Sequence, residues 1–278
     1  MTTTGDLYLD LLKKCLSASI YEESAWKIIE PASVSRRRNL ISTVRSIFIK
    51  SLAKRSLIIV KKLPFKLSIR ENGKDWPCFG YTMIGHRRLD NIRFCIEDIL
   101  RNNVRGDFIE TGAWRGGSAI FMRGILKIYS ITDRIIWVAD SFEGMPKPKT
   151  VIYSADEGWD ISHVELLKVS LEQVKANFER FGLLDDQVRF LKGWFCDTLP
   201  NAPIEKLSLL RLDGDLYEST MDSLKNLYYR VSSGGYVIVD DYNVWPPCEK
   251  AVTDFLKEQK ISVEIKKIDD HAIYWQVP

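Results

Sequence analysis

From Gly106 onward, short apolar runs alternate with longer segments in which apolar residues recur at helical spacing. The runs predict strands at 107–110, 135–140, 188–191, 207–213 and 236–240. Between them lie segments of helix length, at 117–129, 163–181, 219–231 and 248–258. Because parallel strands need such crossover connections, the alternation predicts a doubly wound, mostly parallel α/β sheet with helices on both faces.

Two further apolar runs, 263–268 and 272–277, follow one another too closely for a helix between them. They predict an antiparallel hairpin at one edge of the sheet. Ahead of the first strand, 6–20 and 87–100 have the apolar spacing of amphipathic helices. We therefore expect one domain, with a helical N-terminal extension over 1–105 and an α/β core over 106–278.

Charge is unevenly distributed along the chain. The net charge is +3, but the segment 31–70, here called the basic segment, holds eleven Lys or Arg and no Asp or Glu. The rest of the chain therefore has a net charge of −8. An enzyme acting on nucleic acid more often spreads positive charge over its catalytic face, so we expect no nucleic-acid partner.

The composition, 45% hydrophobic and 28% charged, is that of a globular protein. No apolar run approaches the roughly 18 residues that span a bilayer, and the first residues lack the pattern of a signal peptide. The five cysteines are scattered, without a C-x-x-C pair. We expect free thiols and a cytoplasmic protein, without a disulfide framework or a zinc site.

The first strand leads into a glycine-rich turn with the pattern Glu110-x-Gly112-x-x-x-Gly116. Ligands of open α/β sheets bind beyond the carboxyl ends of the strands, where glycines allow a close approach. The turn lacks the G-x-G-x-x-G pattern that binds a pyrophosphate. An acidic residue before the first glycine suits a cationic amino-acid ligand such as S-adenosylmethionine, although glycines here can also serve a tight turn alone.

Two other strand ends extend this ligand hypothesis. Asp140 ends the second strand, where a carboxylate can accept hydrogen bonds from both hydroxyls of a ribose, or can simply cap the next helix. After the third strand, Trp194 offers an aromatic side chain near the expected adenine, with a core tryptophan as the alternative.

The fourth and fifth predicted strands each end in two carboxylates, Asp213 with Asp215 and Asp240 with Asp241. Four acids at neighbouring strand ends repel one another unless a cation neutralises them. Ligands that are all oxygen favour Mg²⁺ over zinc. A metal there can polarise a substrate hydroxyl while a nearby carboxylate removes its proton, whereas the alternative is a set of solvated helix caps.

Together these residues resemble the macrocin O-methyltransferase family, whose members methylate sugar hydroxyls of macrolides and of novobiocin. The matching stretches include Asp6-Leu7-Tyr8, Thr82-Met83-Ile84-Gly85, 106–117, 138–144, Gly193-Trp194-Phe195, 211–215 and 234–242. The resemblance implies a class I, Rossmann-like methyltransferase fold, a homo-oligomer, S-adenosylmethionine and Mg²⁺ as cofactors, and a sugar acceptor that is a small molecule or linked to a glycan.

The resemblance also assigns roles. It implies that Asp213, Asp240 and Asp241 bind the metal and that Asp215 is the general base. The residues around the methyl donor would be Met83, Glu110, Thr111, Gly112, Trp114, Gly116, Gly117, Asp140, Ser141, Phe142, Gly193 and Trp194.

Three alternatives stay open from the sequence. The acceptor could be a catechol or another phenol, since such enzymes use similar metal chemistry. The chain could be a non-catalytic, membrane-associated protein on the same fold. The basic segment, where Ile41, Val44, Phe48 and Leu52 share one helical face, could be a solvated lid or a subunit contact; alternatively, 36–70 could contact the inner, anionic face of a membrane.

Overall fold

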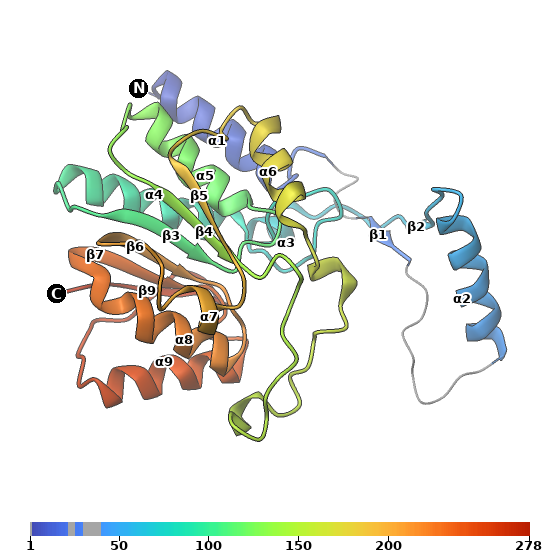
Figure 1. Ribbon diagram of the computed structural model, residues 1–278. Helices are drawn as coiled ribbons and strands as arrows, with labels where there is room; N and C mark the ends of the chain where they lie inside the picture. Colours follow the sequence, from blue (N-terminus) through green and yellow to red (C-terminus); the bar gives the residue numbers. More distant parts are fainter. Residues whose placement is uncertain (1, 22–25, 30–39) are drawn as a thin grey trace.

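The computed structural model describes residues 2–21, 26–29 and 40–278, and most of these residues surround a seven-stranded sheet (Figure 1). The strand order across the sheet is β5 (Val188–Lys192), β4 (Ile136–Asp140), β3 (Asp107–Thr111), β6 (Leu207–Leu212), β7 (Val231–Val239), β9 (Ile273–Gln276) and β8 (Lys266–Lys267). The first five strands are parallel, and β9 runs antiparallel to both of its neighbours. The predicted fold class and edge hairpin are confirmed.

Two layers of helices cover the sheet (Figure 1). On one face lie α1 (Thr4–Leu16), α4 (His86–Arg101), α5 (Gly117–Ile128) and α6 (Leu171–Arg180), and on the other lie α7 (Phe195–Thr198), α8 (Tyr217–Leu227) and α9 (Pro246–Glu258). Because strand side chains alternate in direction, Phe108 belongs to the first hydrophobic cluster and its neighbour Ile109 to the second. Both are fully buried, which explains the near-continuous apolar runs of the sequence.

Several predicted helix boundaries were wrong. The helix predicted at 163–181 begins only at Leu171, because the Ser170 hydroxyl accepts a hydrogen bond from the Gln173 amide and caps the helix there. The helix predicted at 219–231 ends at Leu227, and β7 starts five residues earlier than expected, at Val231. The first helix spans Thr4–Leu16 rather than 6–20, since Thr3 and Asp6 form a capping box.

The N-terminal extension divides into a packed part and a projecting part. Leu9, Leu12 and Leu16 of α1 belong to the same buried cluster as Phe108 of the sheet. By contrast, α2 (Leu40–Ala53) stands away from the sheet, beyond the short antiparallel pair of β1 (Lys27–Ile28) and β2 (Val60–Lys61) (Figure 1). A helix in the basic segment was predicted and is present, whereas 31–39 lie outside the described residues.

No helix among the described residues is both long and apolar enough to span a membrane. All five cysteines are free thiols, as expected from their spacing.

Candidate active site

A cavity of about 650 Å³ lies at the carboxyl edge of the parallel strands. The chain runs outward from β3 through β4 to β5 and then returns to place β6 on the other side of β3. This reversal of strand order is where open α/β sheets bind their ligands. The volume lies within the range of small-molecule sites.

The structure brings most of the predicted site residues to this one cavity. Its wall includes Met83, Gly112, Trp114, Asp140, Ser141, Gly193, Trp194, Asp213, Asp215, Asp240 and Asp241. Five other predicted residues do not line it, namely Glu110, Thr111, Gly116, Gly117 and Phe142. Four of them form hydrogen bonds with residues that do line it: Glu110 with Ser118, Thr111 with Asp213, Gly116 with Ala113 and Phe142 with Asp140.

Gly112 and Gly117 are needed for close approaches of the backbone. Gly112 has a φ of +93°, and a Cβ added there would lie 1.7 Å from the carbonyl oxygen of Asp213. The ends of β3 and β6 therefore meet more closely than any side chain would allow. At Gly117, the amide donates to the carbonyl of Tyr81, and a Cβ would lie 2.5 Å from that oxygen. The glycine-rich turn thus joins two parts of the site.

Asp140 both lines the cavity and shapes the glycine-rich turn. Its Oδ2 accepts hydrogen bonds from the amides of Ala113 at 2.7 Å and Trp114 at 3.3 Å. Its Oδ1 accepts one from the amide of Phe142 at 2.7 Å. The alternative that this carboxylate only caps the next helix is wrong, because no helix begins directly after Asp140 and its hydrogen bonds hold turns at a position that also faces the cavity.

Glu110 is fully buried beneath the cavity and contacts Arg211. The guanidinium group of Arg211 donates to Glu110 at 2.6 Å and to Asp213 at 2.8 Å from Nη1, and to Asp240 at 2.5 Å from Nη2. Ser118 donates a further hydrogen bond to Glu110. Burial nevertheless raises the pKa of Glu110 to about 7. The residue is engaged by the protein itself and does not reach the cavity.

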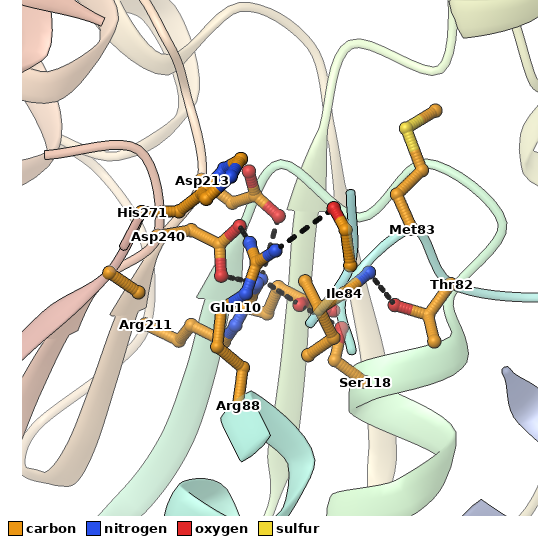
Figure 2. A network of polar contacts seen from close by, with 12 residues as sticks. Thr82, Met83, Ile84, Arg88, Glu110, Ser118, Arg211, Asp213, Asp240 and His271 are labelled. Atoms are coloured by element: carbon orange, nitrogen blue, oxygen red, sulfur yellow. Dashed lines mark hydrogen bonds and ion pairs between the residues drawn. The ribbon is translucent and has the colours of Figure 1, made fainter. Parts of the chain in front are cut away.

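Arg88 of α4 contacts the carboxylates from another side. Its Nη1 donates to Oδ2 of Asp240, and its Nε lies 3.1 Å from Asp269. Asp240 thus has one oxygen on each guanidinium group, and Figure 2 shows both groups against it. Sequence reasoning missed Arg88, Arg211 and Asp269, although a charged residue within the buried run of β6 was a visible signal for Arg211.

The four strand-end acids lie together, as expected from their positions. Ligand atoms of Asp213, Asp240 and Asp241 lie within 4.8 Å of one another. Burial and the nearby carboxylate of Asp213 raise the pKa of Asp215 to about 7. Burial and the carboxylate of Asp215 raise the pKa of Asp241 well above its ordinary value. If all four acids were ionised, they would carry more negative charge than the two guanidinium groups offset, and burial together with this repulsion raises the pKa values of Asp213, Asp215 and Asp241.

Asp215 also has an unusual backbone conformation. Its φ of +56° lies in the left-handed region, which non-glycine residues seldom adopt. Such conformations cost about 1–3 kcal/mol and are concentrated at functional sites. The turn after β6 places the Asp215 carboxylate on the cavity wall, and the backbone strain at Asp215 is the energetic cost of that position.

The loop 72–85 closes one side of the cavity without regular secondary structure, and arginine side chains hold it in place. Arg70, at the end of α3 (Leu67–Glu71), is fully buried. It donates to the carbonyls of Met83 and of Ile84, the latter at 2.9 Å, and pairs with Asp75 at 3.0 Å. Arg115 donates to two further carbonyls of the loop, those of Cys78 and Gly80.

Another part of the cavity wall is formed by the loop after β4 and by the residues at the start of α8 and just before α9. Lys149 pairs with Glu218 at 2.5 Å, beside Cys196 and Asp222. Trp245, which precedes α9, packs against Trp159 with ring centroids 5.0 Å apart. His271 also lines the cavity, although its sequence context gave no indication of this. This wall combines aromatic rings with charged groups.

Comparisons with known proteins agree with this arrangement. The family model described as Macrocin-O-methyltransferase (TylF) matches residues 5–277. Demethyldecarbamoylnovobiocin O-methyltransferase of Streptomyces niveus is 46% identical over 273 residues, which cover 98% of this chain and 94% of that protein. The 8-demethyl-8-(2,3-dimethoxy-alpha-L-rhamnosyl)-tetracenomycin-C 4'-O-methyltransferase of Streptomyces olivaceus is 44% identical over 276 residues, or 98% of this chain and 92% of that protein.

A solved structure, that of the O-methyltransferase NovP, is 45% identical and superposes with a TM-score of 0.82. The superposition covers 98% of this chain and 99% of that one. Both the sequence matches and the superposition therefore span the α/β core together with its N-terminal extension. The chain belongs to the macrocin O-methyltransferase (TylF) family and is an S-adenosylmethionine-dependent O-methyltransferase.

Proposed function

We propose that this enzyme transfers the methyl group of S-adenosylmethionine to a hydroxyl group of a sugar in a natural product or glycan, with the aid of Mg²⁺. The observation that carries the proposal is the group of Asp213, Asp240 and Asp241, whose ligand atoms lie within 4.8 Å of one another on the cavity wall. The sugar follows from the relative whose substrate name contains a rhamnosyl group.

The charge of the site supports a bound divalent cation. Six carboxylates belong to this network, those of Glu110, Asp213, Asp215, Asp240, Asp241 and Asp269, against two guanidinium groups. Oδ2 of Asp241 is buried without a hydrogen-bond partner, which is costly unless a ligand approaches it. Carboxylate oxygens are the ligands that Mg²⁺ prefers, and the donor set fits this ion.

In this proposal Asp213, Asp240 and Asp241 hold the metal, which would polarise the acceptor hydroxyl and so make it more acidic. Asp215 accepts the hydroxyl proton. The acceptor oxygen forms a bond to the methyl carbon as the bond from that carbon to sulfur breaks, leaving S-adenosylhomocysteine. Asp140 and the glycine-rich turn bind the donor, while Arg88 and Arg211 fix the carboxylate of Asp240.

The test separates the base from the metal ligands. Asp215→Asn should lose about 10²–10⁴-fold in turnover, the usual contribution of a general base, while still binding Mg²⁺ and S-adenosylmethionine in calorimetry. Asp241→Asn leaves both arginine contacts of Asp240 in place and should weaken Mg²⁺ binding, with activity partly restored by added Mg²⁺. Near-normal turnover of Asp215→Asn at saturating Mg²⁺ would refute the base assignment.

A catechol or phenol is the second candidate acceptor, because Trp76 and Trp245 offer flat aromatic surfaces on the cavity wall. Parallel assays with glycosylated and phenolic acceptors distinguish the two classes.

The non-catalytic alternative has no support in these relatives, which are named as methyltransferases. The homo-oligomer implied by the family is part of the proposal, and sedimentation velocity measures it.

A further inference from the structure

The turn between β6 and α8 holds Asp215 in a strained conformation. The amide of Leu216 donates to the carbonyl of Gly214 at 2.6 Å, which makes Asp215 the central residue of a three-residue turn of the γ type. Its φ of +56° belongs to the rarer, strained form of this turn. Such conformations persist only where the surrounding structure fixes them. The contacts on either side of Asp215 therefore decide where its carboxylate lies.

The two sides of this γ-turn are held in different ways. Before the turn, the amide of Asp213 donates to the carbonyl of Thr111 at 2.9 Å and so extends the pairing of β6 with β3. After the turn, α8 begins without a cap of its own, because its N-cap residue is Leu216, whose side chain cannot accept a hydrogen bond. The sheet thus fixes one side, and the other side needs a partner from elsewhere in the chain.

That partner is Asp156, which lies 61 positions before Tyr217 and ends the short 3₁₀ helix η2 (Ser154–Asp156). Its side chain is fully buried. Oδ1 accepts a hydrogen bond from the amide of Tyr217 at 2.6 Å, and Oδ2 accepts one from the amide of Glu218 at 3.2 Å. These are the first two amides of α8, where a negative charge also suits the helix dipole. Asp156 therefore supplies the cap that Leu216 cannot provide.

The loop that carries Asp156 is also attached to the cavity wall on both sides of it. Lys149 pairs with Glu218 at 2.5 Å, and Trp159 packs against Trp245. Those two contacts join side chains. The hydrogen bonds of Asp156 instead reach the backbone that directly follows the γ-turn. Asp156 is thus the loop residue that is best placed to fix the turn.

We propose that Asp156 is a positioning residue for methyl transfer, which caps α8 and thereby holds the γ-turn that keeps the Asp215 carboxylate at the acceptor hydroxyl. Asp156 does not line the cavity, so it acts through Asp215 rather than on the substrate. The inference rests on the proposed role of Asp215 as the base. A displacement of about 1 Å at a reacting group can lower a rate about 10²-fold, so loss of the cap should reduce kcat.

Initial rates, measured with the acceptor that the parallel assays identify, test this role. Asp156→Ala should lower kcat about 10–10²-fold. The KM for S-adenosylmethionine and the Kd for Mg²⁺ should stay unchanged, because Arg211 still holds Asp213 in place. Asp156→Asn keeps one acceptor oxygen, so its kcat should lie between those of the wild type and Asp156→Ala. Hydrogen exchange at the first amides of α8 should rise in the same order, without any acceptor present.

The matched control is Asp160→Ala, which removes a carboxylate from the same loop. Asp160 is exposed, and its Oδ1 accepts hydrogen bonds from the amide and the hydroxyl of Ser162 rather than from α8. This variant should keep the kcat and the hydrogen exchange of the wild type. A double variant gives the sharpest readout. If Asp156 acts through Asp215, adding Asp156→Ala to Asp215→Asn should lower kcat no further.

The outcomes separate this inference from the proposed function. A wild-type kcat in Asp156→Ala while Asp215→Asn is impaired, or additive losses in the double variant, would overturn the role of Asp156 alone. Near-normal turnover of Asp215→Asn would refute the base assignment, and the role of Asp156 with it. Thermal unfolding shows whether Asp156→Ala is folded. If it is not, Asp156→Asn, which keeps the shape of the side chain, decides by the same comparisons.

Discussion

Gly112 offers a quantitative test of how the site is built on the fold. In Gly112→Ala, the new Cβ would lie 1.7 Å from the Asp213 carbonyl oxygen, so the ends of β3 and β6 must separate. The positive φ of +93° adds about 1–2 kcal/mol of backbone strain for a residue with a side chain. Overpacking in a rigid setting costs about 1–3 kcal/mol more. We expect a total loss of about 2–5 kcal/mol in the free energy of unfolding.

Gly158→Ala is the matched control, because Gly158 also has a positive φ, +85°, but has nothing within 4 Å of an added Cβ. It should lose only the strain, about 1–2 kcal/mol. Denaturant unfolding measures both, and calorimetry should show weaker Mg²⁺ binding in Gly112→Ala alone, since Asp213 is displaced. Equal losses in the two variants would refute the close approach of β3 and β6.

Three further predictions concern the polar network. Arg70→Met should lower the free energy of unfolding by about 3 kcal/mol or more, because a buried ion pair loses one partner. It should also raise KM, because Arg70 holds the loop 72–85 that lines the cavity. Arg105→Met, which replaces an exposed arginine, is the control for thermal unfolding. Without added divalent cation, Asp240→Asn should lower Tm, since Arg88 and Arg211 lose their shared partner, whereas Asp241→Asn should raise it by relieving repulsion. Burial and Lys13 lower the pKa of His86, so below about pH 6.5 the unfolded chain binds the proton more readily than the folded chain. The free energy of unfolding should therefore fall as the pH drops below about 6.5. His86→Gln should reduce this dependence of the free energy of unfolding on pH.

The sheet and the position of the acids were predictable because both follow from local rules. An apolar run that ends in a carboxylate marks the carboxyl end of a buried strand, and all such ends of a parallel sheet meet at one edge. This is why Asp140, Asp213 and Asp240 could be assigned to one site without knowledge of the strand order. The start of α6 was also encoded, since Ser170 precedes Gln173 at the spacing of a capping box.

The arginine contacts could not be predicted in the same way. Arg88 and Asp269 are 181 positions apart, and no periodicity indicates that they meet at Asp240. Arg70 belongs to a segment in which every charge is basic, so no pattern distinguishes it from its exposed neighbours. The face of α2 raises a related problem. Helical spacing grouped Val44 with Phe48, but spacing alone does not tell whether the chain itself covers that face.

The contacts of the clustered acids divide them into two kinds. Burial alone would raise the pKa of Asp240, but Arg88 and Arg211 each hold one of its oxygens and together lower it. This carboxylate is fixed in place and remains ionised. Asp241 keeps a buried oxygen without a partner, and its pKa is raised. Because a cation is favoured most strongly by charge that the protein has left unpaired, Asp241 should contribute more to metal affinity, and Asp240 more to the geometry of the site.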